Sequence, residues 1–169
     1  MTIRNSPARS DPLTDKLRAA IEHRATWMYL LMDEARKRGL DWNDFARAAI
    51  RKCGRFHGEH KFHSESDLAA FGRNFANDEV IGIFEMDVRE ASAERLYIEF
   101  HYCPLVAAWK KLGASDADCA QLCDIAMDGD RGIVDACPSF EFSLGTVIAK
   151  GGDCCQVTIA RKKPRERRG

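Results

Sequence analysis

The sequence predicts an α+β domain in which N-terminal helices precede an antiparallel sheet of about four strands, arranged as two hairpins with helices between them. Apolar residues in the first part of the chain recur at helical spacing between capping residues. Two later regions contain paired runs that alternate apolar and polar residues. The length of 169 residues suits one domain. We place it at residues 11–160, between a flexible N-terminus (1–10) and a basic disordered tail (161–169).

Three helices are predicted before the first strand. Serine, aspartate and proline at 10–12 mark the start of a helix that covers about 13–38 and ends at a glycine. Spacings of three and four predict a core-facing stripe of Leu17, Ala20, Ile21, Trp27, Met28 and Leu31. A second helix of about a dozen residues is expected to end near Gly54, and a short third helix covers 67–75. The segment 55–66 between them is expected to be a loop or a fraying helix end.

The four predicted strands form two hairpins. Apolar residues within 79–88 and alternation over 94–102 predict the first pair, joined by a polar loop. Alternation over 140–148 and 155–159 predicts the second pair, with a turn at Gly151-Gly152.

Two helical segments separate these hairpins. A short helix covers 105–112, after a proline that ends the preceding strand. A second helix starts at a serine cap at 115 and carries Cys119 and Cys123 on its buried stripe. The sequence Asp128-Gly129-Asp130 is expected to break this helix, with a further helical piece running to about 136.

Charge and cysteine content narrow the class of protein. The formal net charge is zero, but the tail 161–169 carries six bases and one acid, so residues 1–160 carry 20 bases and 25 acids. An acidic body makes nucleic-acid binding an unfavoured function and leaves small molecules as the expected partners, with a homo-oligomer as an option. No apolar run is long enough to span a membrane. Seven cysteines, an odd number, with no apolar leader, predict reduced thiols and a cytoplasmic location.

One strand brings possible catalytic groups together. If the strand over 94–102 continues briefly, Glu99, His101 and Cys103 project from the same face. Cys103 also precedes a helix, whose positive N-terminal end lowers the pKa of a nearby thiol. An imidazole beside a thiol is a typical nucleophile pair. The competing interpretation, that Cys103 is a small buried hydrophobe and His101 a solvated strand residue, is favoured by residue statistics alone.

Metal sites and acidic clusters give weaker signals. The six cysteines from 103 onward could supply zinc ligands, but no C-x-x-C pair occurs, so zinc stays a minor option and no cofactor is predicted. The three histidines His57, His60 and His63 fit a solvated loop better than a metal site. Asp128 and Asp130 lack a calcium-loop pattern; they are either solvated helix-end residues or a general base.

Three segments together carry a family resemblance. They are the run from His101 to Gly113, which begins His-Tyr-Cys-Pro-Leu and contains Trp109, then Leu122-Cys123-Asp124 leading to Asp128, then Lys150-Gly-Gly-Asp-Cys-Cys155 with its alternating strand. Over about residues 80–160 the chain resembles the L-2-amino-thiazoline-4-carboxylic acid hydrolase family. On that pattern the matching positions are Cys103, Cys123, Asp128 and Cys155, although the neighbouring Cys154 competes with Cys155 for the last of them.

The resemblance implies hydrolytic opening of a thiazoline or related cyclic amidine to an N-carbamoyl amino acid. Attack on the ring carbon between nitrogen and sulfur would use Cys103, activated by His101 or the helix N-terminus, with Asp128 or Asp130 as base. Cys123 is assigned to the same catalytic group. Substrate binding is assigned to Asp153, Cys155 and an arginine, Arg55 or Arg131, which would hold the substrate carboxylate.

A second resemblance supports a different class of function. The glycine turn with its late cysteine also looks like the 4-vinyl reductase domain, a small-molecule-binding module. On that interpretation the protein is a non-catalytic module whose thiols hold a metal or sense oxidation.

Overall fold

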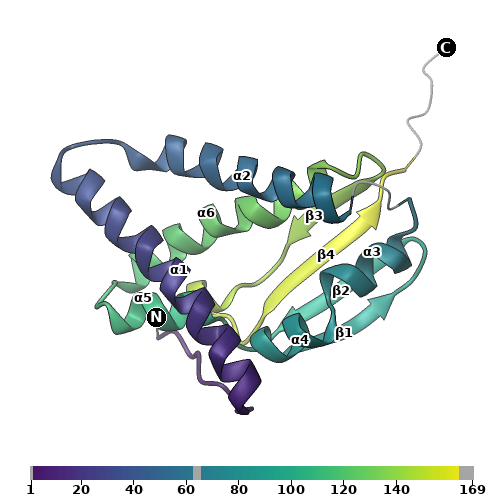
Figure 1. Ribbon diagram of the computed structural model, residues 1–169, viewed down its shortest axis with the longest axis horizontal. Coiled ribbons are helices and arrows are strands. Elements are labelled where there is room, and N and C mark those ends of the chain that lie inside the picture. The colour runs from purple at the N-terminus through teal and green to yellow at the C-terminus, as the bar shows by residue number, and fades with distance from the viewer. Residues whose placement is uncertain (1, 63–65, 164–169) are drawn as a thin grey trace.

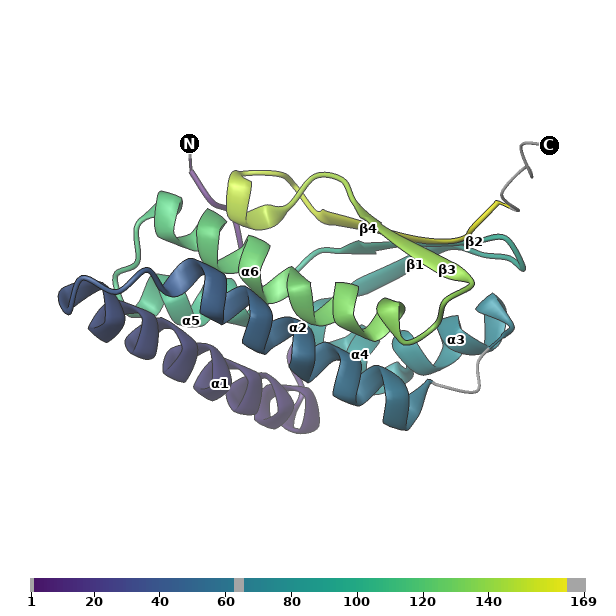
Figure 2. The same ribbon diagram turned by 90° about the horizontal axis from the view of Figure 1, so that it is seen from above.

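The long helices lie on one side of an antiparallel sheet and form two main layers with it (Figures 1 and 2). This arrangement confirms the predicted α+β class. The computed structural model describes residues 2–62 and 66–163. In chain order the elements are α1 (Pro12–Lys37), α2 (Trp42–Lys61), α3 (Leu68–Phe75), α4 (Asp78–Phe84), β1 (Met86–Ala91), β2 (Arg95–Phe100), α5 (Pro104–Lys111), α6 (Asp116–Asp135), β3 (Phe140–Leu144), the 3-10 helix η1 (Ile148–Lys150) and β4 (Cys155–Arg161).

The sheet has the order β1-β2-β4-β3, and all its pairs are antiparallel. The two hairpins join through β2 and β4, with Phe100 opposite Cys155 and Leu96 opposite Ile159. Alternate side chains on these strands are buried against the helices, as the pattern over 94–102 predicts. Because Phe100 and Cys155 are buried at the same end of the sheet, the chain segments that leave this end at 101–103 and enter it at 151–154 lie close to each other.

Helices α2 and α6 pack together through glycines (Figure 2). The predicted helix end near Gly54 and the predicted break at Asp128-Gly129-Asp130 are both wrong, because α2 and α6 continue through them. A Cβ atom on Gly54 would overlap the carbonyl oxygen of Gly129, and one on Gly132 would overlap that of Arg51. The glycines therefore serve close helix contact, and the segment 55–66, predicted as a loop, is helical up to Lys61.

The limits of α1 are confirmed, but its buried face is not the predicted stripe. Asp11 caps the helix by accepting hydrogen bonds from the N–H groups of Leu13 and Thr14. Trp27 and Leu31 are 64% and 68% exposed. The buried residues are instead Arg18, Ala25, Met32 and Ala35. The small residue Ala25 faces α5, where its carbonyl oxygen accepts a hydrogen bond from the Trp109 indole.

The first predicted strand is wrong over its first half. Residues 78–84 form α4, capped by Asn77, because an apolar run this short fits a helix as well as a strand. Glu85 then takes a left-handed conformation with φ of +50°, and β1 starts at Met86. The third strand is shorter than expected, ending at Leu144, because Ile148 belongs to η1. No helix in the described part of the chain is long and apolar enough to cross a membrane.

Candidate active site

Cys103 lies at the N-terminal cap of α5, where the chain leaves β2. The nearby backbone N–H groups of Val106 and Leu105 lower the pKa of its thiol, but they make no capping hydrogen bond with the sulfur. Burial acts in the opposite direction and dominates, raising the pKa of the Cys103 thiol to about 11. Cys103 is therefore a protonated thiol at neutral pH, in contrast to the lowered pKa expected from its position before a helix.

Two further thiols, from distant parts of the chain, lie close enough to Cys103 to sense its charge. They are Cys123 on α6 and Cys155 at the start of β4, and a negative charge on Cys103 raises the pKa of both. Burial is the largest cause of each shift, and it raises the pKa of Cys155 to about 12. The Cys155 sulfur also accepts a hydrogen bond from the N–H of Ile148, at 3.3 Å.

Cys155, and not Cys154, faces this group of thiols. Cys155 is 8% exposed and shares the buried face of β4 with Val157 and Ile159. Cys154 is less buried than Cys155, and its pKa is raised first by partial burial and then by the charge of Glu99, on the outer face of the sheet. The alternation of the strand therefore decides between the two neighbouring thiols. All seven cysteines are free.

Asp130 lies beside the thiols. A charge on Asp130 raises the pKa of both Cys103 and Cys155. Burial raises the pKa of the Asp130 carboxyl to about 6, while the positive charges of Arg24 and Arg131 lower it. The carboxylate makes no hydrogen bond or ion pair with any other described residue. We name Cys103, Cys123, Cys155 and Asp130 the thiol–carboxylate cluster.

Asp128, two residues earlier, points to the other side of α6. It is 6% exposed and pairs with arginines of α2 and α6: its carboxylate lies 3.1 Å from Arg47, 3.5 Å from Arg51 and 3.0 Å from Arg131. Arg131 is thus bound to Asp128, and it also pairs with Asp124 at 3.2 Å. This geometry assigns Asp128 and Arg131 to the contact between α2 and α6.

Two other predicted residues lie outside the cluster. The Nε2 atom of His101 is buried and has no aligned hydrogen-bond partner among the described residues, but it lies 3.3 Å from a carboxylate oxygen of Asp87 and 3.9 Å from one of Glu99. His101 is not among the groups that affect the Cys103 thiol. Arg55 is exposed on α2, with Glu59 as its ion-pair partner at 3.9 Å.

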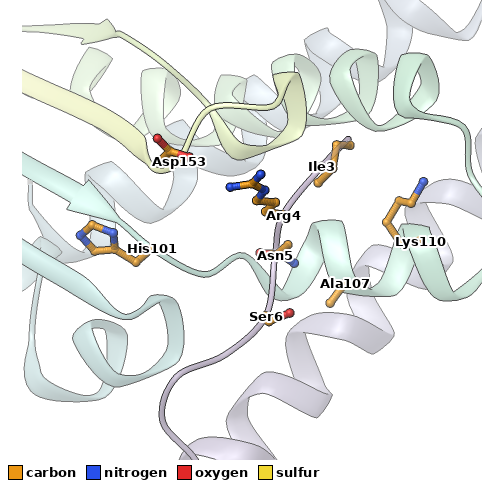
Figure 3. A pocket seen from close by; sticks show the side chains of 8 residues that line it. All are labelled: Ile3, Arg4, Asn5, Ser6, His101, Ala107, Lys110 and Asp153. Atoms are coloured by element: carbon orange, nitrogen blue, oxygen red, sulfur yellow. The ribbon is translucent and has the colours of Figure 1, made fainter. Parts of the chain in front are cut away.

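An open pocket of about 720 Å³ is lined in part by Asn5, whose side chain hydrogen-bonds to the backbone of Cys103 (Figure 3). Residues from the N-terminal segment, the end of β2, α5 and the turn before β4 form its walls: Ile3, Arg4, Asn5, Ser6, His101, Ala107, Lys110 and Asp153. Asp153, predicted to bind substrate, therefore lines a pocket. The N-terminal residues of the pocket are not predicted from the sequence, because a short irregular segment carries no pattern that indicates tertiary contacts.

Residues expected to be a flexible N-terminus make specific contacts with the domain. The Asn5 side chain donates to the carbonyl oxygen of Cys103 at 2.9 Å and accepts from its N–H at 2.8 Å. The N–H groups of Ala8 and Arg9 donate to the Glu85 carboxylate. At the other end of the chain, Arg161 belongs to β4, and 164–169 lie outside the described residues.

No three histidine, cysteine, aspartate or glutamate side chains within 2–62 and 66–163 are placed to hold a metal ion. His57 and His60 are exposed on α2, and His63 lies outside the described residues.

Comparison with known proteins bears on family and fold. The family model described as L-2-amino-thiazoline-4-carboxylic acid hydrolase matches residues 18–159. No curated protein matches the chain significantly. A crystal structure of trafficking protein particle complex subunit 3 from Naegleria fowleri, covalently bound to palmitic acid, is similar with a TM-score of 0.54 and 12% identity, over 86% of this chain and 97% of that one. At this identity the likeness shows a shared fold.

Proposed function

This chain belongs to the L-2-amino-thiazoline-4-carboxylic acid hydrolase family, and we propose that it opens a small cyclic amidine of the 2-amino-thiazoline-4-carboxylate class by hydrolysis. The product is the corresponding N-carbamoyl amino acid, which for this thiazoline is N-carbamoyl-cysteine. The observation that carries the proposal is the thiol–carboxylate cluster, whose Cys103 is hydrogen-bonded through its backbone to Asn5 in the wall of an open pocket. A protonated thiol next to a carboxylate that has no hydrogen-bond partner can attack carbon once the carboxylate removes the proton of the thiol.

The first half of the reaction forms a bond between the enzyme and the ring carbon. Asp130, whose pKa of about 6 leaves it ionised at neutral pH, accepts the proton of Cys103. The Cys103 sulfur attacks the ring carbon that lies between nitrogen and sulfur. The bond from this carbon to the ring sulfur then breaks, and the departing sulfur takes the proton from Asp130. The substrate remains attached to Cys103 as an S-amidino group.

The second half releases the product. Asp130 removes a proton from a water molecule, which attacks the same carbon. The bond to Cys103 breaks, and the Cys103 sulfur recovers the proton from Asp130. The carbon keeps the oxygen of water and becomes the carbonyl of the N-carbamoyl product. One water molecule is consumed, and the enzyme returns to its starting state.

Steady-state kinetics with three variants test these roles. Cys103→Ala and Asp130→Asn are each expected to lower kcat/KM by about 10²–10⁴-fold, the usual range for losing a nucleophile or a general base. Cys154→Ala is the matched control, since Cys154 lies beside Cys155 but outside the cluster. Mass spectrometry of the quenched wild-type reaction is expected to show the S-amidino adduct on Cys103. Wild-type activity in both Cys103→Ala and Asp130→Asn would disprove the mechanism.

The pH dependence offers a second check. Because Asp130 must be ionised to accept a proton, kcat/KM is expected to fall as the pH drops through about 6. This acidic limb is expected to be missing from the residual activity of Asp130→Asn. A limb that persists unchanged in this variant would assign the base to another residue.

A further inference from the structure

The N-terminal residues 2–9 run along the pocket as a strap that is attached at two points, Asn5 and residues 8–9 (Figure 3). At the first point Asn5 forms its paired hydrogen bonds with the backbone of Cys103, at 2.9 and 2.8 Å. These bonds replace those that a neighbouring strand would make beyond the end of β2. The strap is thus attached at the residue that carries the proposed nucleophile.

The second attachment point of the strap is held by a buried ion pair. Arg18 and Glu85 are 4% and 8% exposed, and their side chains meet at 2.9 Å. The Glu85 carboxylate accepts hydrogen bonds from the N–H groups of Ala8 and Arg9, while Arg18 donates to the carbonyl oxygen of Arg9 at 2.6 Å. Glu85 also has the positive φ of +50°, a conformation that costs a residue other than glycine about 1–2 kcal/mol. The fold thus maintains a strained residue at the point where it holds the strap.

Directly before its attachment at Asn5, the strap places Arg4 in the wall of the pocket. Arg4 forms no hydrogen bond or ion pair with any other described residue. The second lysine or arginine of the pocket, Lys110, is already committed, because its ammonium group lies 2.9 Å from Asp116 and donates to the carbonyl oxygen of Ala114. Arg4 is therefore the guanidinium available to a ligand in this pocket.

Asp153 supplies the opposite charge on another wall. In Figure 3 the Arg4 side chain extends toward the side of the pocket where Asp153 and His101 lie. Arg4 and Asp153 are not in ion-pair contact, and Asp153 is exposed. An unpaired guanidinium and an unpaired carboxylate on the walls of one pocket suit a ligand that carries both charges itself.

We propose that Arg4 binds the carboxylate of the substrate and Asp153 its cationic amidine, so that the strap selects small zwitterions and orients them beside Cys103. This inference rests on the proposed function, because the site it deepens is the one assigned to ring opening. It places the carboxylate-binding arginine on the strap, whereas the two arginines suggested by sequence are an exposed residue of α2 and a partner of Asp128.

Equilibrium binding separates this inference from the chemistry. Isothermal titration calorimetry of the full chain carrying Cys103→Ala, which leaves the substrate intact, uses 2-amino-thiazoline-4-carboxylate and 2-amino-thiazoline as the two probes. Arg4→Gln is expected to raise the Kd of the carboxylate probe by about 10–100-fold and to leave the Kd of the probe without a carboxylate unchanged. Arg4→Lys is expected to recover part of this affinity, since it keeps the charge but not the paired donors.

Arg9→Gln is the matched control. It makes the same change on the same strap, but the Arg9 side chain is exposed and does not line the pocket. Equal affinities for Arg4→Gln and Arg9→Gln, or no binding of the carboxylate probe by any variant, would overturn the inference. Turnover by the wild-type protein is measured separately, so that ring opening without an Arg4 effect rejects only the inference. Selective binding without turnover rejects only the proposed function.

Discussion

Two aspartates of α6, two residues apart and on different faces of the helix, show how the same residue type comes to serve structure or chemistry. Asp128 is buried among the guanidinium groups of Arg47, Arg51 and Arg131, which neutralise its charge. Asp130 is partly exposed and lies beside thiols, and burial raises its pKa to about 6. The difference lies in the partners that each carboxylate meets, since both side chains leave the same regular helix.

The comparison extends to the two faces of the helix. The face toward α2 has glycines that allow close packing, and its charges are paired. The face toward α5 and the sheet has Cys123 and Asp130, whose polar groups have few partners. Uncompensated polar groups are costly in a folded protein and concentrate where function requires them. The first face therefore holds the fold together, and the second is the one on which we expect chemistry.

The largest effect is expected where the two helices touch. Gly54→Ala would place a methyl group on the backbone of Gly129, so the helices must separate, at an expected cost of about 3 kcal/mol in the free energy of unfolding. Gly129→Ala is the matched control, because its new Cβ atom would lie 3.7 Å from Ile50, an ordinary contact. It is expected to be neutral or to stabilise the helix by up to about 1 kcal/mol. Urea denaturation of both variants measures the difference, and equal destabilisation would contradict the close-contact interpretation.

The two aspartates are expected to respond in opposite directions. Asp128→Asn leaves three arginines without their shared carboxylate and is expected to destabilise the protein by about 2 kcal/mol. Asp130→Asn removes a charge that burial disfavours. It is expected to raise the free energy of unfolding at pH 7.5 by about 1 kcal/mol, while lowering kcat/KM by the factor of about 10²–10⁴ given above.

The pH dependence fixes the sign of the Asp130 effect. Its folded pKa of about 6 lies above the ordinary value of 3.8, so the folded state holds the proton more tightly. The stability from this group is complete below about pH 3.8 and is lost as the pH rises through 6. The advantage of Asp130→Asn over wild type should therefore appear above pH 6 and vanish near pH 4. Thermal unfolding at several pH values tests this, and an advantage that is independent of pH would count against it.

The smallest effect is expected at Arg55. This arginine lies on α2 with Arg47 and Arg51, but it is exposed and its partner Glu59 is 3.9 Å away. Arg55→Ala is expected to change the free energy of unfolding by less than about 0.5 kcal/mol and to leave KM unchanged. A marked rise in KM would restore this residue to the substrate-binding role that the sequence suggested.

Local patterns were enough to predict several elements of this fold. Alternation in Leu96, Ile98 and Phe100 predicts β2, and a capping serine predicts the start of α6. Local patterns gave wrong predictions where a residue's role depends on a contact with a distant part of the chain. Local rules predict that Gly54 ends a helix, yet it lies inside α2, because the backbone of Gly129 on α6 occupies the space of its missing side chain.

The sequence by itself determined the fold class, the alternation that turns Cys155 inward, and the family to which the chain belongs. Only the tertiary structure decided which charges are neutralised and which face a pocket. Asp128 and Asp130 look alike in sequence, and Arg4 looks like part of a polar end. Their environments depend on α2, on β4 and on residues about a hundred positions away, and periodicity within one element carries no information about such contacts.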